Sequence, residues 1–364
     1  MFNNVYENKK VLVTGHTGFK GSWLSTWLLK LGAEVVGISK DIPTSPAMFD
    51  VLSLEKKIKH VKADIRDFVE VKTILEVEKP DFVFHLAAQA IVSTSYSNPL
   101  DTVTSNVLGT ANVLESLRVS NQKCTAIIIT SDKAYDNVEQ IWGYKENDAM
   151  GGKDVYSGSK GAAELVIKSY YHSFFKSDDS NVRLSIARAG NVIGGGDWAK
   201  DRIVVDAMIA WSKGVQVSVR SPNATRPWQH VLEPISGYLT LGERLHSNKK
   251  LSGEGFNFGP RAEQNRTVRE LLQNSCLYWN IGSNEAFTVT ENIKFHEAGL
   301  LKLNCDKALT CLHWNANLDY DETIRFTNEW YFDYYSEGEM LSKTLAQIQE
   351  YEDIAMQKGL SWTG

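Results

Sequence analysis

The stretch VLVTGHTGFKG, residues 11–21, decides the fold. An apolar run leads directly into Gly15, Gly18 and Gly21, and helical spacing follows as far as Gly32. In such a strand-turn-helix unit the first glycine permits a tight turn, the second lets the backbone approach a phosphate, and the third allows close packing. The start of the helix adds N–H donors and partial positive charge. The pattern predicts a dinucleotide-binding turn, and a purely structural glycine turn is the alternative.

Short apolar runs and helical patterns alternate through the first half of the chain. Strands are predicted at 9–15, 33–38, 60–65, 81–89, 125–131 and 182–188, and helices at 21–32, 68–80, 104–120 and 154–175. This alternation predicts an α/β fold, a Rossmann-type doubly wound parallel sheet. Beyond residue 191 the regularity gives way to loops rich in Gly, Pro, Asn and Arg. We therefore predict an NAD-binding Rossmann domain over 1–190, with part of 225–245 returning to it. A smaller, loop-rich α/β substrate-binding lobe over 191–364 is interleaved with it.

Composition narrows the classes of partner. The chain of 364 residues is 43% apolar and carries a net charge of -5. Nucleic acid and anionic membranes need a basic face, so neither is expected as a partner. The start MFNNVYENKK lacks the apolar core of a signal peptide, and no window approaches the roughly 18 apolar residues of a membrane span. The cysteines form no CxxC pair, and the spacing of Cys305, Cys311 and His313 is not that of a metal site. We expect a cytoplasmic protein without a metal.

A second motif supplies acid–base chemistry. In DVYSGSKGAAE, Tyr156 and Lys160 are four residues apart in a helical stretch, so both project from one face. An ammonium close to a phenol stabilises the phenolate. With Ser131, at the end of a predicted strand, they form a constellation in which serine holds a substrate oxygen and tyrosine takes its proton, while lysine also binds a nicotinamide ribose. This predicts hydride transfer between a secondary alcohol and a nicotinamide.

The GxxGxxG spacing of the glycine turn resembles that of the extended short-chain dehydrogenase/reductase superfamily. The resemblance implies cofactor contacts from Gly15, His16, Gly18, Phe19, Gly21, Asp41, Asp64, Ile65, Leu86, Ala87, Ala88, Tyr156 and Lys160. Relatives usually carry an acid for the adenosine ribose where this chain has Ser39, Lys40 and Asp41. We expect Asp41 to serve from a shifted position and NAD to be the cofactor. The alternative is that Lys40 favours a 2′-phosphate, and so NADP. Asp64 could instead be merely solvated.

The apolar strand IIITSDK, residues 127–133, ends in Ser131, Asp132 and Lys133. Burying such charges is costly unless they are paired or used. Oxidation or epimerisation of an alcohol needs only Ser131, Tyr156 and Lys160, so the extra acid and amine suggest a further proton transfer. Oxidation of a hexose 4-hydroxyl acidifies the C5 proton. A base and an acid can then eliminate the C6 hydroxyl as water.

The chain resembles the nucleotide-sugar 4,6-dehydratases over nearly its whole length, and these carry Thr-Asp-Glu at this strand end. By position, Ser131 matches the threonine, Asp132 the acid that protonates the leaving oxygen, and Lys133 the glutamate base. A lysine acts as a base only when neutral. Lys133 could instead form a structural salt bridge with Asp132, leaving water or Asp132 as the base. SDK, HTGFKGSW and RPWQHV together resemble the CDP-glucose branch of this family. That resemblance implies CDP-glucose as substrate and a place in deoxysugar synthesis for the O-antigen of bacterial lipopolysaccharide.

The region 183–269 holds thirteen Lys and Arg against seven Asp and Glu, which suits a diphosphate. Asn191 and Arg226 match positions that contact the sugar diphosphate in the family, and Arg202 and Arg266 are further candidates. Any of these arginines could also lie on a solvated face. Trp198 and Trp228 could stack on a nucleobase or pack in a core. The spacing of these residues does not distinguish cytosine from other bases.

Two rival functions fit parts of the pattern. An NAD-dependent epimerase or reductase of the same fold would leave Asp132 and Lys133 idle, and a non-catalytic dinucleotide-binding protein would not need Ser131, Tyr156 and Lys160 together. Family members usually dimerise through two helices from each subunit, which here are the helical runs after Pro99 and through Tyr156. The resemblance thus implies a homodimer or homotetramer, although the apolar faces could be buried within one chain.

Overall fold

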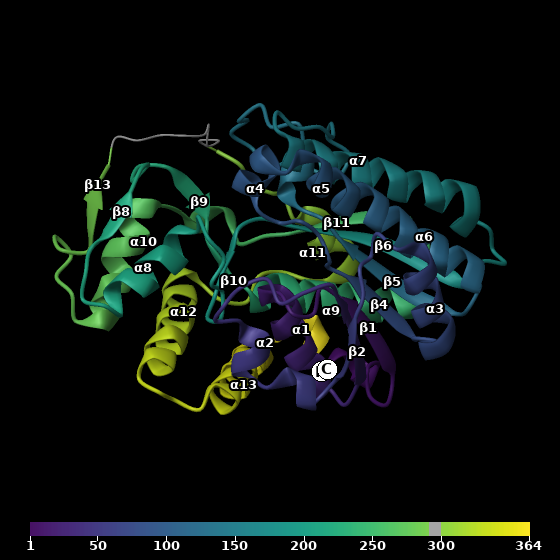
Figure 1. Cartoon of the computed structure of the whole chain (residues 1–364), viewed down its shortest axis with the longest axis horizontal. Coiled ribbons are helices and arrows are strands. Elements are labelled where there is room, and N and C mark those ends of the chain that lie inside the picture. Colours follow the sequence, from purple (N-terminus) through teal and green to yellow (C-terminus); the bar gives the residue numbers. More distant parts are fainter. Residues whose placement is uncertain (291–299) are drawn as a thin grey trace.

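The computed structural model describes residues 1–290 and 300–364. Its central feature is a seven-stranded parallel sheet in the order β11-β6-β5-β4-β1-β2-β3 (Figure 1). The strands are β1 (Lys10–Thr14), β2 (Glu34–Ser39), β3 (Lys59–Lys62), β4 (Phe82–His85), β5 (Cys124–Ile129), β6 (Val182–Ala189) and β11 (Gly255–Phe258). The order reverses between β1 and β4, as in a doubly wound fold, where ligands bind beyond the carboxyl ends of the strands. The predicted Rossmann-type sheet is confirmed.

Helices cover both faces of this sheet because both faces are apolar. Successive strand residues point to opposite sides, so Val11 and Val13 join one core cluster and Leu12 joins another. The first cluster lies under α1 (Phe19–Lys30) and α9 (Leu232–Ser247), and the second lies under α3 (Phe68–Glu78), α6 (Gly109–Ser120) and α7 (Val155–Tyr170). Two short helices, α4 (Val92–Ser97) and α5 (Pro99–Val103), pack beside α7.

A smaller set of helices and short strands lies at one end of the molecule, on the left in Figure 1. It contains α8 (Ile203–Trp211), β8 (Val217–Val219), β9 (Thr225–Pro227), β12 (Asn265–Thr267), α10 (Val268–Ser275), β13 (Phe287–Val289) and α12 (Tyr320–Tyr335). Two connecting strands, β7 (Val192–Ile193) and β10 (Gln229–His230), pair in parallel. The chain returns to the main sheet over a longer stretch than 225–245, because β11 at 255–258 forms its edge strand and α11 (Asp306–Leu312) packs on that strand. Helix α13 (Met340–Gln357) contacts α1 and α12.

The two tryptophans weighed as stacking residues are core residues. Trp198 is 7% exposed and packs against Trp330 and Tyr334, with ring centroids 5.8 and 4.8 Å away. Trp228 is 4% exposed, and its indole N–H donates to the carbonyl of Arg266. The core-packing alternative therefore describes both side chains.

Within residues 1–290 and 300–364, no helix is long and apolar enough to cross a membrane. No group of three or more His, Cys, Asp and Glu residues in those ranges could hold a metal ion. All four cysteines are free thiols, and Cys124 is buried in β5.

Candidate active site

The glycine turn joins β1 to α1 with the geometry that the sequence predicts. Gly15 has φ +76°, and a Cβ placed on it would lie 2.8 Å from the Ala87 backbone nitrogen. A Cβ on Gly21 would lie 2.2 Å from the Gly15 carbonyl oxygen, so only glycine fits there. At Gly18, by contrast, the nearest atom is the Gly15 carbonyl oxygen at 3.4 Å.

Gly18 is also the N-cap of α1, and no side chain caps that helix end. The first N–H groups of a helix need partners from outside the helix, and the helix dipole favours a negative charge there. The turn thus leaves an open backbone surface at a helix N-terminus, which is what a bound pyrophosphate requires. The glycine turn fits a dinucleotide cofactor.

His16, inside this turn, faces inward. Its Nε2 lies 2.7 Å from His60 Nδ1, and its ring fills the space beside Gly37. Burial lowers the pKa of His16 to about 4, so the ring is neutral at neutral pH. Any cofactor contact from His16 would therefore come from its backbone.

The end of β2 is a hydrogen-bonded turn. The Thr17 and Ser39 hydroxyl oxygens lie 2.7 Å apart, and both hydroxyls donate to the Asp41 carbonyl, at 2.7 and 3.1 Å. The side chains of Lys40 and Asp41 are exposed.

The other predicted adenosine contacts lie after β3 and β4. Asp64 accepts hydrogen bonds from the Arg66 guanidinium at 2.9 and 2.5 Å, and these bonds hold the pKa of Asp64 below its usual value. Ile65 is buried beneath α6. After β4, the amide of Leu86 donates to the Thr14 carbonyl and that of Ala87 to the Thr14 hydroxyl, which places the Leu86–Ala88 loop beside the glycine turn.

Strand β5 delivers Ser131 and Asp132 to the same edge of the sheet. The Ser131 hydroxyl donates to Asp132 Oδ1 at 2.9 Å, and its oxygen accepts from the Lys133 amide at 3.3 Å. Asp132 is 5% exposed, and burial raises the pKa of its carboxyl. A raised pKa suits a group that must hold a proton and then give it up.

Helix α7 brings Tyr156 and Lys160 to this point. It begins at Val155 because the Asp154 side chain caps it, accepting from the Ser157 amide at 2.9 Å. Lys160 Nζ lies 6.0 Å from the centroid of the Tyr156 ring, and both residues are buried. Burial raises the pKa of Tyr156 to about 12, while its hydrogen bond with Ser131 acts in the opposite direction. Burial lowers the pKa of Lys160 to about 8, opposed by Glu164. Ser131, Asp132, Tyr156 and Lys160 thus meet at one site.

Lys133 is half-buried at the same strand end. The positive charge of Lys133 lowers the pKa of Asp132 and so opposes the effect of burial. Within the described residues, however, the Lys133 ammonium forms no ion pair with the Asp132 carboxylate at 4.0 Å or less. The salt-bridge alternative is therefore not the arrangement in this structure.

The substrate-lobe candidates fall into two groups. Asn191 follows Gly190, where an added Cβ would lie 3.2 Å from Asp132 Oδ2, so this segment runs past the Asp132 carboxyl. Arg202 forms an ion pair with Asp197, and its charge lowers the pKa of Tyr156. These contacts place Asn191 beside Asp132 and Arg202 near Tyr156.

Arg226 on β9 and Arg266 on β12 are direct partners in the antiparallel pair of these strands. Direct cross-strand partners project to the same face, and like charges at such positions are destabilising. In this structure the Arg226 guanidinium donates to the Thr225 carbonyl at 2.8 Å, and the Arg266 guanidinium donates to the Glu263 carbonyl at 2.8 Å and lies over the Tyr320 ring.

Lys20 is a site residue that the sequence did not predict. It lies in the first turn of α1, and its Nζ approaches the Tyr238 hydroxyl at 3.4 Å. Burial lowers the pKa of Lys20 to about 8, and its charge is felt by Asp132 and Lys160. The sequence feature that could have identified Lys20 is its position between Gly18 and Gly21, where a glycine turn leads into an apolar helix.

A model of the GDP-mannose 4,6 dehydratase family matches residues 12–327, which include every catalytic residue described above. The chain belongs to this family. It is 42% identical over 351 residues to the CDP-glucose 4,6-dehydratase of Salmonella typhimurium, covering 96% of this chain and 97% of that protein. It is also 26% identical to the CDP-paratose 2-epimerase of Salmonella typhi, over 88% of this chain and 98% of that one. Membership of a dehydratase family agrees with the dehydratase resemblance of the sequence.

Solved structures share the fold. The dTDP-glucose 4,6-dehydratase of Bacillus anthracis, solved in complex with NAD, superposes with a TM-score of 0.75 at 18% identity, covering 92% of this chain and 99% of that one. The UDP-glucose 4-epimerase of Thermotoga maritima, solved with UDP-glucose, gives a TM-score of 0.77 at 22% identity, covering 89% and 99%. Dehydratases and epimerases therefore have this architecture in common, and the distinction between them lies in the site.

Proposed function

We propose that this protein is an NAD-dependent nucleotide-sugar 4,6-dehydratase that converts CDP-glucose to CDP-4-dehydro-6-deoxyglucose and water. The observation that carries the proposal is the buried acid Asp132, hydrogen-bonded to Ser131 and beside Tyr156. An epimerase or reductase has no use for a second acid at this position. The 42% identity to a CDP-glucose 4,6-dehydratase supports the same reaction.

The chain's own residues fit NAD at the glycine turn. Gly15, Gly18 and the uncapped start of α1 would hold its pyrophosphate, and Lys160 would hold the nicotinamide ribose. When bound, NAD supplies a positively charged ring that accepts the hydride from C4 and later returns it to C6.

Oxidation at C4 needs a group to take the hydroxyl proton. Tyr156 is that group, with Ser131 hydrogen-bonded to it and able to hold the same substrate oxygen. Because the pKa of Tyr156 is about 12, each nearby positive charge that favours the phenolate brings the phenol closer to working range. Lys160 and Arg202 provide such charges.

Elimination across C5 and C6 needs a base and an acid. Asp132, whose pKa burial raises, protonates the departing C6 oxygen. Lys133, which makes no ion pair with Asp132 within 4.0 Å, would remove the C5 proton. The ketone at C4 makes this step feasible because it stabilises the carbanion that forms at C5.

The diphosphate of the substrate would accept hydrogen bonds from Arg226 and Arg266, which are cross-strand partners on β9 and β12. Asn191, beside the catalytic acid, would contact the adjoining sugar phosphate. The choice of cytosine is supported by the identity to the CDP-glucose enzyme.

In this proposal residues 1–190, with the returning strand and helix of the main sheet, bind the cofactor, and the interleaved lobe within 191–364 binds the nucleotide sugar. Two subunits would pair through the helical runs after Pro99 and through Tyr156. Exposed apolar side chains on these runs support that pairing: Leu100 is 79% exposed and Leu165 is 58% exposed.

The test is to incubate the purified protein and NAD with CDP-glucose, UDP-glucose and dTDP-glucose in parallel, following product mass and NADH absorbance. Loss of one water from CDP-glucose, without accumulated NADH, is the expected result. An unchanged mass with inverted C4, or stoichiometric NADH without dehydration, would refute the dehydratase and favour the epimerase or reductase.

A further inference from the structure

A buried carboxylate joins the two elements that carry the catalytic groups. Glu164 lies on α7, one helical turn beyond Lys160, and is fully buried. Its carboxylate accepts from the Thr130 hydroxyl at 2.6 Å and from Arg188 Nε and Nη2, both at 2.6 Å. Thr130 directly precedes Ser131, so Glu164 ties the helix of Tyr156 and Lys160 to the strand end that carries Ser131.

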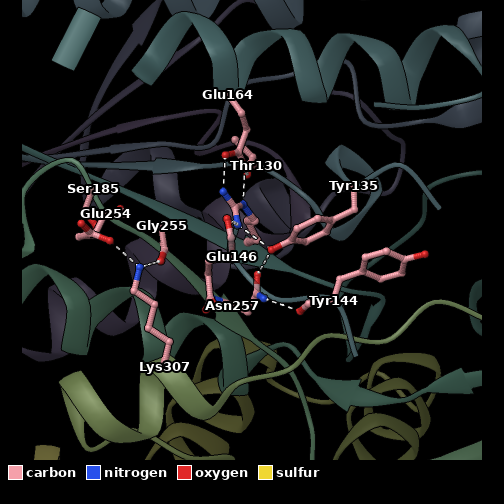
Figure 2. Close-up of polar contacts among 11 residues, drawn as sticks. Thr130, Tyr135, Tyr144, Glu146, Glu164, Ser185, Glu254, Gly255, Asn257 and Lys307 are labelled. Carbon is pink, nitrogen blue, oxygen red and sulfur yellow. Dashed lines mark hydrogen bonds and ion pairs between the residues drawn. The ribbon is translucent and has the colours of Figure 1, made fainter. Parts of the chain in front are cut away.

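Arg188, on β6, extends this link to the other side of the catalytic strand end. Its Nη1 donates to the Tyr135 hydroxyl at 2.6 Å, and the guanidinium carbon lies 5.0 Å from the centroid of that ring. Tyr135 comes two residues after Lys133. The segment 131–133 is thus held at both flanks, through Thr130 and through Tyr135 (Figure 2).

The network continues to β11 and to the chain after residue 299. The Tyr135 hydroxyl donates to Asn257 Oδ1 at 2.8 Å, and the Asn257 amide side chain donates to the carbonyls of Tyr144 and Asn304. Figure 2 shows Glu164, Thr130, Tyr135, Asn257 and Tyr144 converging on one region. The side chains of Thr130, Glu164, Arg188, Tyr135 and Asn257 all form hydrogen bonds in this network, as a buried polar network needs if it is to be rigid.

Stability alone is a weak reason for such an ion pair. Glu164 and Arg188 are 0–1% exposed, and replacing a buried ion pair with apolar residues is often neutral or stabilising. A planar guanidinium that binds both carboxylate oxygens does fix orientation closely. Catalytic rates are sensitive to such orientation, since a misplacement of about 1 Å can cost about 100-fold.

We propose that Glu164 and Arg188 are positioning residues, which hold Ser131 and the Tyr156–Lys160 pair at their working separation. This inference rests on the proposed function, because it assigns the two residues to the same oxidation step. Neither residue needs to touch substrate; each acts through the segments that it fixes.

The same carboxylate also has an electrostatic effect on Lys160. The titratable groups that face Lys160 are Glu164 and Tyr156 from its own helix, His85 from β4 and Lys20 from α1. The negative charge of Glu164 favours the ammonium form of Lys160 and so raises its pKa against the effect of burial. Loss of its charge should lower the pKa of Lys160, whereas loss of the geometry alone should not.

The kinetic test compares Glu164→Gln, Arg188→Lys and Thr130→Val with a control. The control is Glu352→Gln, which breaks the ion pair of a buried carboxylate with the partly exposed Lys30 on α1 and weakens a hydrogen bond from Trp27. Glu352 contacts none of the catalytic groups. We expect the first two variants to lower kcat about 10–100-fold and the third about 3–10-fold, with KM within about 2-fold of the native value. The control should keep its kcat despite a similar loss of thermal stability.

The second readout needs neither substrate nor cofactor. NMR of protein with isotope-labelled lysine, with the Lys160 signal assigned from Lys160→Met, gives the pKa of Lys160. We expect Glu164→Gln to lower that pKa by about one unit and Arg188→Lys to leave it unchanged.

The inference is overturned if Glu164→Gln and Arg188→Lys lose no more kcat than the control, or if the pKa of Lys160 is the same in both variants and the native protein. Should Glu164→Gln fail to fold, Arg188→Lys and Thr130→Val decide the kinetic question. Should the native protein leave CDP-glucose unchanged, the proposed function fails, and the titration still tests the link from Glu164 to Lys160.

Discussion

Replacement of Asp132 by Asn should separate the two halves of the proposed reaction. Asparagine has nearly the shape of aspartate and can still accept the Ser131 hydroxyl bond, seen at 2.9 Å, but it cannot deliver a proton. General acid catalysis contributes about 100–10,000-fold to a rate. Because a tenfold change in rate corresponds to about 1.4 kcal/mol of activation free energy, we expect the barrier to elimination to rise by about 3–5 kcal/mol in this variant. Oxidation at C4, which uses Ser131, Tyr156 and Lys160, should persist.

The assay mixes native or variant protein with CDP-glucose and NAD and follows NADH absorbance and product mass together. Native protein should release dehydrated product with no lasting NADH signal. Asp132→Asn should show an early rise in NADH, up to one equivalent for each site, and almost no loss of water. Asp136→Asn, an exposed change on the same loop, is the matched control and should behave like the native protein.

A measurement of unfolding free energy would show whether misfolding causes the loss of dehydration in Asp132→Asn. Burial raises the folded-state pKa of Asp132, so the folded state binds the proton more tightly than the unfolded state. Its contribution to stability is present below the unfolded pKa of about 4 and is lost as pH rises through the folded pKa. At neutral pH the Asn variant should therefore be at least as stable as the native protein. The role assigned to Asp132 would be refuted if Asp132→Asn dehydrated CDP-glucose at the native rate. It would also be refuted if the variant kept its fold but lost oxidation at C4.

Three further predictions follow from the same geometry. In Gly21→Ala the added Cβ would lie 2.2 Å from the Gly15 carbonyl oxygen, so we expect the free energy of unfolding to fall by about 3 kcal/mol or more. Gly18→Ala should keep its thermal stability but bind NAD more weakly, as measured by calorimetry. Arg226→Ala and Arg266→Ala should raise KM for CDP-glucose at least about 10-fold with kcat nearly unchanged, and a comparable effect on kcat would contradict a purely binding role. Lys133→Met should lower dehydration about 100-fold or more while sparing C4 oxidation, and Lys133→Glu should restore part of it; full activity in the Met variant would mean that another group is the C5 base.

The Rossmann half was predictable because its signals are local. Apart from β3 (KHVK), each strand of this half is a short, mostly apolar run, and Gly15, Gly18 and Gly21 mark the turn whose backbone must remain open. Tyr156 and Lys160 were predictable for the same reason, since helical spacing alone puts them on one face. The strand β11 at the sheet edge was not predicted, because its pairing with β6 joins segments far apart in the chain.

The supporting groups of the site depended on contacts that no local pattern reveals. Glu164 stands in the quoted motif DVYSGSKGAAE, but its partner Arg188 lies on another strand. Lys20 was not predicted as a site residue because its partner Tyr238 lies on α9, 218 residues further along the chain. Trp198 and Trp228 could not be assigned from sequence because a loop-rich region gives no period from which to infer burial.

The most direct test of the dehydratase mechanism follows one hydrogen atom. CDP-glucose carrying deuterium at C4 is converted with NAD, and the product is examined by mass spectrometry and NMR. If one cofactor molecule oxidises C4 and reduces C6 within a single turnover, the product has lost water and carries the deuterium at C6. Deuterium that returns to C4 of a sugar that has kept its water, or that leaves with released cofactor, would contradict the mechanism and identify an epimerase or a simple dehydrogenase.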